Sequence, residues 1–126
     1  MNKLEKSKNI LWLAEPEKHD YPAAFSYLNL LYEKNKSDRF VQKLKKAKMS
    51  AFKAKDIFRA SQLSLLGVSN SHVDKNTQKI KEKKTLSPLL LVRDSTVGKL
   101  IVADGYHRLC AVYLVNEDAL IPCKII

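Results

Sequence analysis

The sequence is poor in the residues that mark extracellular, membrane-spanning or disordered chains. Its 126 residues include two cysteines, three glycines, four prolines and one tryptophan. No apolar run approaches the roughly 20 residues that cross a bilayer, and the run at 10–14 is too short for the apolar core of a signal peptide. Because 45% of the residues are hydrophobic, the composition is that of a folded globular protein, which we expect in the cytoplasm.

The two cysteines, Cys110 and Cys123, have neither a metal-binding spacing nor the density of a disulfide framework. We interpret them as partly buried thiols in a reducing compartment. We identify no set of metal ligands in the sequence, and the sequence does not indicate an oligomeric state.

Charge is abundant but unevenly distributed. The formal net charge is +10, and residues 34–59 carry ten lysines or arginines against two acids, whereas residues 85–126 carry four of each sign. A basic field of this kind attracts nucleic acid or anionic ligands. Solvated helix faces in a lysine-rich protein are the alternative interpretation.

Apolar residues at helical spacing predict two amphipathic helices before residue 50. Asp20 followed by Pro22 predicts the start of the first, which we expect to end near residues 33–34. Ser37 is expected to cap the second, whose solvent side is mostly lysine. Residues 1–50 are therefore expected to form a helical extension packed on the core, and the whole chain is expected to be one structural unit.

Residues 51–126 mix short strands with helices. Alternation from Ser50 predicts a strand, Asp56 is expected to cap a short helix, and two continuous apolar runs predict central strands joined by a hairpin that contains Gly98. This order predicts an α+β domain with a small mixed sheet and flanking helices. The expected elements are a strand from 50, a helix 56–62, a loop 67–71, a helix through Val73, Thr77 and Ile80, strands 89–92 and 100–103, a helix 106–115 and a strand 122–126.

The turn between the second central strand and the next helix is the strongest candidate site. The segment Asp104-Gly105-Tyr106-His107-Arg108 should leave the first amides of the helix unpaired, and those amides with the helix dipole favour an anion. Gly105 permits a close ligand approach, and His107 and Arg108 add donors suited to phosphate.

Two residues of this turn have alternative interpretations. Asp104 could cap the helix, pair with Arg108 or His107, hold a cation or a substrate hydroxyl, or be a surface residue without a role. His107 could be a packed, hydrogen-bonded histidine rather than a ligand.

Taken together, residues 53–126 resemble the ParB/sulfiredoxin superfamily. Gly105-Tyr106-His107-Arg108 is similar to the Gly-Cys-His-Arg turn of sulfiredoxins, which bind ATP, and more distantly to the Gly-Glu-Arg-Arg turn of ParB proteins, which bind CTP. The resemblance implies a ParB/sulfiredoxin-like domain at 51–126 that binds a nucleotide (ATP, ADP or CTP), with or without Mg²⁺. Tyr106 stands where sulfiredoxins have their nucleophilic cysteine, so sulfiredoxin activity is not expected.

The same resemblance suggests roles for residues outside the turn. A free-serine kinase of this fold has a carboxylate near its first strand as base, and Asp56 has the corresponding position. Asn70 and His72 lie where the superfamily has a second ligand-contacting loop, so His72 is expected to face His107 across a cleft.

Three functions follow as hypotheses. The first is a nucleotide-binding protein in which Gly105, Tyr106, His107, Arg108, Asn70 and His72 bind the nucleotide. In it, Asp104, His107 and Asp56 would support phosphoryl transfer or nucleotide hydrolysis. The second is a DNA- or RNA-binding protein or nuclease that uses the basic face 34–59. The third is a non-catalytic interaction protein.

Overall fold

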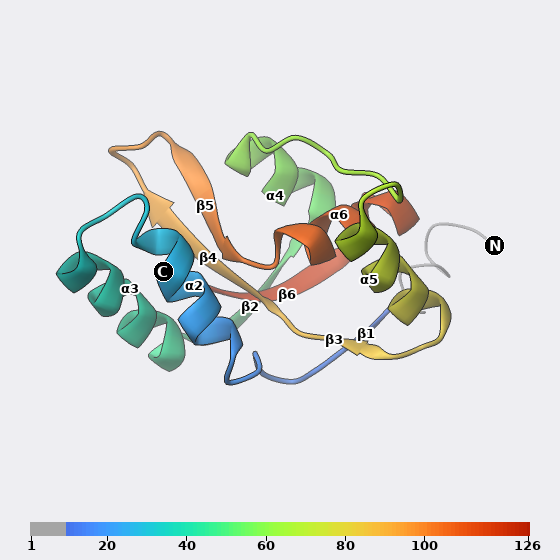
Figure 1. Ribbon diagram of the computed structural model, residues 1–126, viewed down its shortest axis with the longest axis horizontal. Coiled ribbons are helices and arrows are strands. Elements are labelled where there is room, and N and C mark those ends of the chain that lie inside the picture. Colours follow the sequence, from blue (N-terminus) through green and yellow to red (C-terminus); the bar gives the residue numbers. More distant parts are fainter. Residues whose placement is uncertain (1–9) are drawn as a thin grey trace.

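The computed structural model describes residues 10–126, and residues 1–9 of the expected extension lie outside the described part. The described chain combines helices with a mixed sheet, which confirms the α+β class (Figure 1). The elements in chain order are β1 (Leu11–Trp12), α2 (Asp20–Leu28), α3 (Lys34–Lys46), β2 (Met49–Lys53), α4 (Ala54–Ser61), α5 (Ser71–Lys81), β3 (Thr85–Leu86), β4 (Leu89–Asp94), β5 (Lys99–Asp104), α6 (Tyr106–Val115) and β6 (Leu120–Ile125).

Four strands form the main sheet in the order β2-β6-β4-β5. As the sequence predicts, β4 and β5 form an antiparallel hairpin, with Leu91 opposite Val102. After α6, the chain returns as β6, parallel to β4, with Ile125 opposite Leu91. β2 completes the sheet antiparallel to β6.

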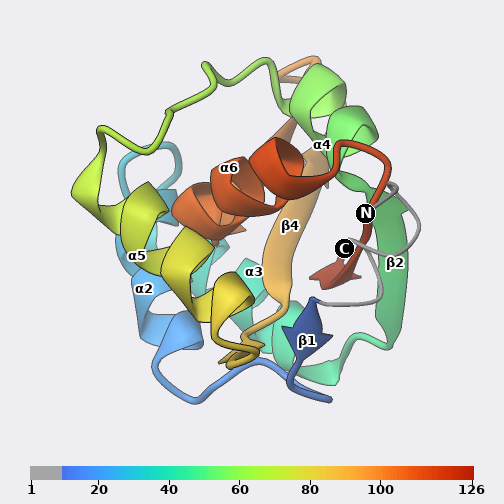
Figure 2. The same cartoon turned by 90° about the vertical axis from the view of Figure 1, so that its right-hand side faces the viewer.

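Helices cover both faces of this sheet, which explains why β4 and β5 are continuous apolar runs rather than alternating ones. Leu89 and Leu91 pack into the core beneath α4, α5 and α6. Leu90 and Val92 point the other way and pack against α2 and α3. Figures 1 and 2 show these two groups of helices on opposite sides of the sheet.

The two expected N-terminal helices are present with different boundaries. α2 ends at Leu28, because tight hydrogen bonds from Leu30 N–H to Tyr27 and from Leu31 N–H to Leu28 close its last turn. α3 begins at Lys34, so Ser37 does not cap it and is instead buried inside the helix. The prediction placed the chain reversal several residues too late.

Asp56 likewise does not cap α4, which begins at Ala54 directly after β2. Backbone carbonyls replace a side-chain cap, because Ala54 N–H donates to Ala119 O and Lys55 N–H donates to Glu117 O, at 2.9 Å each. The segment before β6 therefore satisfies the first amides of α4. Asp56 is left in the first turn, where it pairs with Arg59.

A small parallel pairing near the N-terminus was not predicted from the sequence. Leu11 and Trp12 of β1 lie opposite Thr85 and Leu86 of β3. Strands of two residues are too short to show an alternating pattern, so only the folded chain reveals this pairing.

The remaining helices follow the predicted pattern more closely. α6 has the predicted bounds, and α5 begins one residue after Asn70, whose Oδ1 accepts hydrogen bonds from His72 N–H and Val73 N–H. Among residues 10–126, no helix has both the length and the apolar character needed to cross a membrane.

Candidate anion-binding site

The turn between β5 and α6 requires glycine for two independent reasons. Gly105 has φ of 111°, a conformation that costs other residues strain. A Cβ at this position would also lie 2.7 Å from Leu89 Cγ and 3.0 Å from Arg108 Nη2. Gly105 is the N-cap of α6. Because glycine has no side chain, no side chain at the N-cap position accepts a hydrogen bond from the first backbone amides of α6.

Asp104 does not cap α6 but forms an ion pair within the same turn. Its Oδ2 lies 3.0 Å from Arg108 Nη2, and the two side chains are only 16% and 17% exposed. The same Nη2 lies 3.5 Å from the carbonyl of Pro88. Arg108 Nε is buried and has no hydrogen-bond partner among residues 10–126. Arg108 is thus fixed at the turn with unused donor capacity.

Asp20 at the start of α2 is a buried neighbour of Asp104 that the sequence analysis assigned only to capping. It accepts hydrogen bonds from Glu17 N–H, at 2.9 Å, and from the hydroxyl of Ser87. Burial raises the pKa of Asp104 to about 6; the Arg108 guanidinium opposes this rise and the Asp20 carboxylate adds to it. Asp104 can therefore exchange a proton near neutral pH.

A cavity of about 260 Å³ lies between this turn and α5. The α5 side contributes four residues at spacings of 3, 4 and 7, which place them on one face of the helix. Three cationic side chains line the cavity, and its one carboxylate is already paired with Arg108. The lining residues are His72, Lys75, Asn76 and Lys79 from α5 with Asp104, Gly105, Tyr106, His107 and Arg108 from the turn.

The structure brings His72 and His107 together at this cavity, with ring centroids 4.9 Å apart. Burial lowers the pKa of His107, and the charges of His72 and Arg108 lower it further. His107 therefore favours its neutral form, in which the ring can both donate and accept a hydrogen bond.

Tyr106 anchors the first turn of α6 rather than replacing a reactive thiol. Its hydroxyl donates to the carbonyl of Ser64, and its ring centroid lies 5.5 Å from that of His107. Cys110, one turn along α6, is buried, and burial raises its pKa. A protonated, buried thiol is a poor nucleophile.

Two of the predicted site residues lie away from this cavity. Asn70 caps α5 with its side-chain oxygen and is not among the residues that line the cavity. Asp56 lines a different cavity beneath α4 and is paired with Arg59 at 3.2 Å. The structure thus does not bring Asp56 to the turn 104–108. Conversely, sequence reasoning did not select Lys75, Asn76 and Lys79, although their spacing from His72 was visible.

The basic residues of α3 lie on the other side of the sheet. α3 packs against β4 and β5 through Val41 and Leu44, on the face opposite α5 and α6. Its lysines are exposed, and Lys36 lies over the ring of Tyr32 at 4.9 Å. The basic face and the turn are therefore separate features.

The fold and the turn together define an α+β protein with a cationic cavity at a helix N-terminus. No protein-family model, curated protein sequence or solved structure matches the chain.

Proposed function

We propose that this protein binds the phosphate groups of a nucleotide at the turn 104–108. One observation carries the proposal: the open amides at the start of α6, Arg108 and the lysines of α5 converge on one cavity. Helix N-termini and arginine side chains are preferred partners of phosphate oxygens. The resemblance of Gly105-Tyr106-His107-Arg108 to the ParB/sulfiredoxin turn supports the same ligand.

The size of the cavity favours phosphates over a whole nucleotide. Sites for small molecules commonly measure about 300–1,000 Å³, and this cavity measures about 260 Å³. We expect the phosphates inside it and the nucleoside along its rim.

Magnesium would arrive with the nucleotide rather than occupy a site built by the chain. The lining residues include one carboxylate, Asp104, and it is held by Arg108. Mg²⁺ prefers several oxygen ligands and retains waters, so these residues do not form a dedicated magnesium site. In phosphoryl transfer or hydrolysis, Asp104 would accept or return a proton and Lys75, Lys79 and Arg108 would balance phosphate charge.

The test uses a double variant on the exposed rim of the cavity. Lys75→Ala with Lys79→Ala should weaken binding of ATP, ADP or CTP at least about tenfold, since two charge-assisted contacts to phosphate are lost. Lys43→Ala with Lys46→Ala removes the same charge from α3 and should leave binding unchanged. Calorimetric titration, with and without Mg²⁺, measures the dissociation constants. The proposal is lost if the wild-type protein binds none of ATP, ADP, CTP, GTP or pyrophosphate.

A nucleic-acid-binding function is the second candidate, favoured by the exposed cations of α3. Asp38 is the one acid within this helix, and seven basic side chains at 34–48 are exposed. The same two double variants separate the functions. If α3 binds DNA or RNA, Lys43→Ala with Lys46→Ala should weaken that binding and reduce its salt dependence, whereas the α5 variant should not.

A further inference from the structure

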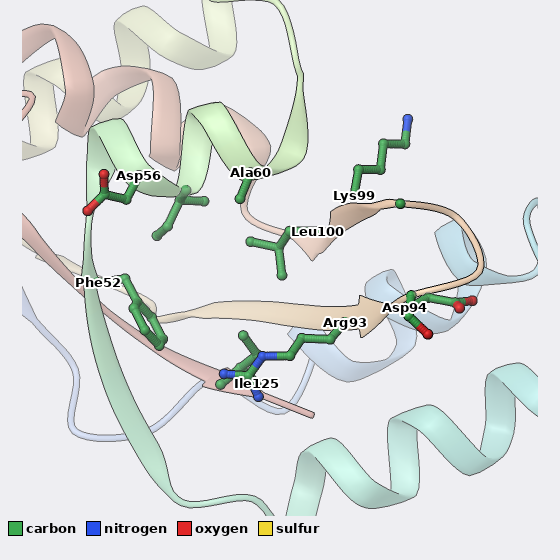
Figure 3. Close-up of a pocket in the computed structure, with 11 residues that line it drawn as sticks. Phe52, Asp56, Ala60, Arg93, Asp94, Lys99, Leu100 and Ile125 are labelled. Carbon is green, nitrogen blue, oxygen red and sulfur yellow. The ribbon is translucent and has the colours of Figure 1, made fainter.

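A second cavity, of about 420 Å³, lies between α4 and the sheet near the β4–β5 hairpin (Figure 3). Its volume is within the range of about 300–1,000 Å³ that is usual for small-molecule sites. Its walls are mainly apolar, and its lining residues come from β2, α4, β4, β5 and β6 and from the loop of the β4–β5 hairpin. The apolar lining consists of Phe52, Ile57, Ala60, Leu100 and Ile125.

Arg93 introduces a positive charge into this apolar surrounding. Figure 3 shows its side chain extending from β4 toward Ile125. Within residues 10–126, its guanidinium forms no ion pair or side-chain hydrogen bond, and its backbone N–H donates to Ile126 O. Burial raises the pKa of Cys123 to about 11, and the charge of Arg93 opposes that rise.

The other charged residues at this cavity do not offset Arg93. Asp56 is paired with Arg59 at 3.2 Å. Asp94 accepts hydrogen bonds from Tyr32 and Thr96, and Figure 3 shows Lys99 pointing away from the cavity. The cavity therefore combines apolar walls with one guanidinium that forms no ion pair within residues 10–126.

We propose that this cavity binds a small apolar molecule that carries a single carboxylate. The hydrocarbon part would occupy the space beneath α4, and the carboxylate would pair with the planar guanidinium of Arg93. The site is separate from the phosphate cavity, because Leu100 lies near the start of β5 and Asp104 ends it. This inference does not depend on the proposed nucleotide binding.

Octanoate is the probe that tests the proposal, titrated calorimetrically into the full-length protein. Octanol and octylamine have the same chain without the carboxylate, and each should bind at least about tenfold more weakly, as expected for loss of a charge-assisted contact. Arg93→Gln should weaken octanoate binding by a similar factor. Arg39→Gln, an exposed arginine of α3 outside the lining, should leave it unchanged.

A second variant tests the location without touching the charge. Ala60 is an exposed residue of α4 that lines the cavity, so Ala60→Trp should fill the space and abolish octanoate binding while the protein stays folded. Equal affinity for octanoate and octanol, full binding by Arg93→Gln, or full binding by Ala60→Trp would each overturn the proposal. Absence of octanoate binding by the wild-type protein would overturn it as well.

Discussion

The two cavities lie near opposite ends of β5 and are chemically opposite. The one at the turn 104–108 is polar and cationic, and its key arginine is largely buried in an ion pair. The one beneath α4 is apolar, and its arginine is exposed and unpaired within the described chain. A buried pair and a conformationally restricted glycine couple the first cavity to folding. Substitutions there should lower stability more than matched substitutions at the second cavity.

Glycine substitutions should separate the two cavities most strongly. Gly105→Ala brings strain of about 1–3 kcal/mol and a clash with Leu89 that costs about 1–3 kcal/mol more. Gly98, which lines the apolar cavity, also has positive φ, 76°, but a Cβ there meets nothing within 4 Å. Gly98→Ala should therefore lose only the strain contribution. Urea denaturation measures both free energies of unfolding, and equal losses would contradict the role of Leu89.

Arginine substitutions should give the next largest difference. Arg108→Ala leaves Asp104 buried without its partner, which should cost about 3 kcal/mol of unfolding free energy. Arg93→Ala removes an exposed side chain and should change stability by less than about 0.5 kcal/mol.

Removal of the carboxylate of Asp104, which Arg108→Ala leaves without its partner, provides the control for the predicted loss of stability. Adding Asp104→Asn to Arg108→Ala should recover part of the lost stability, because no buried charge then remains unpaired. If the double variant were no more stable than Arg108→Ala, the loss would come from packing of the arginine rather than from the ion pair.

The elements with long, regular patterns were predictable from the sequence. β4, β5 and α6 were predicted correctly, because continuous apolar runs and helical spacing can be recognised in the local sequence alone. The ends of α2 and the start of α4 were missed, since the tight last turn and the carbonyls of Ala119 and Glu117 are not visible in the local sequence.

The candidate site was predictable in part for the same reason. Gly105, His107 and Arg108 lie in one contiguous turn, and the structure adds His72 to them at one cavity. Asp20 reaches Asp104 only through packing of α2 on the sheet, across more than 80 residues of chain. Lys75 and Lys79 have the spacing of one helical face in the sequence, but tertiary packing decides which face of α5 meets the turn.

The smallest expected effect is a difference in pH dependence, which isolates Asp104. Its folded-state pKa, raised to about 6, lies above the ordinary value of 3.8, so the folded protein holds this proton more tightly than the unfolded chain. The stabilisation is complete below about pH 4 and is lost as the pH rises through about 6. Between pH 4 and 7, the wild-type protein should therefore lose stability relative to Asp104→Asn.

The pH dependence must be compared between the wild type and Asp104→Asn, because His107 also changes stability with pH. Its lowered pKa acts in the opposite direction, because the unfolded chain binds that proton more readily and stability falls as the pH falls. His107 is present in both proteins, so the difference between their urea-denaturation curves at each pH reports Asp104. Asp56→Asn, which removes the exposed carboxylate of the other cavity, is the matched control and should follow the wild-type profile. Parallel profiles for the wild type and Asp104→Asn would show that burial does not hold a proton on Asp104, and the polar cavity would then carry a full negative charge beside any bound phosphate.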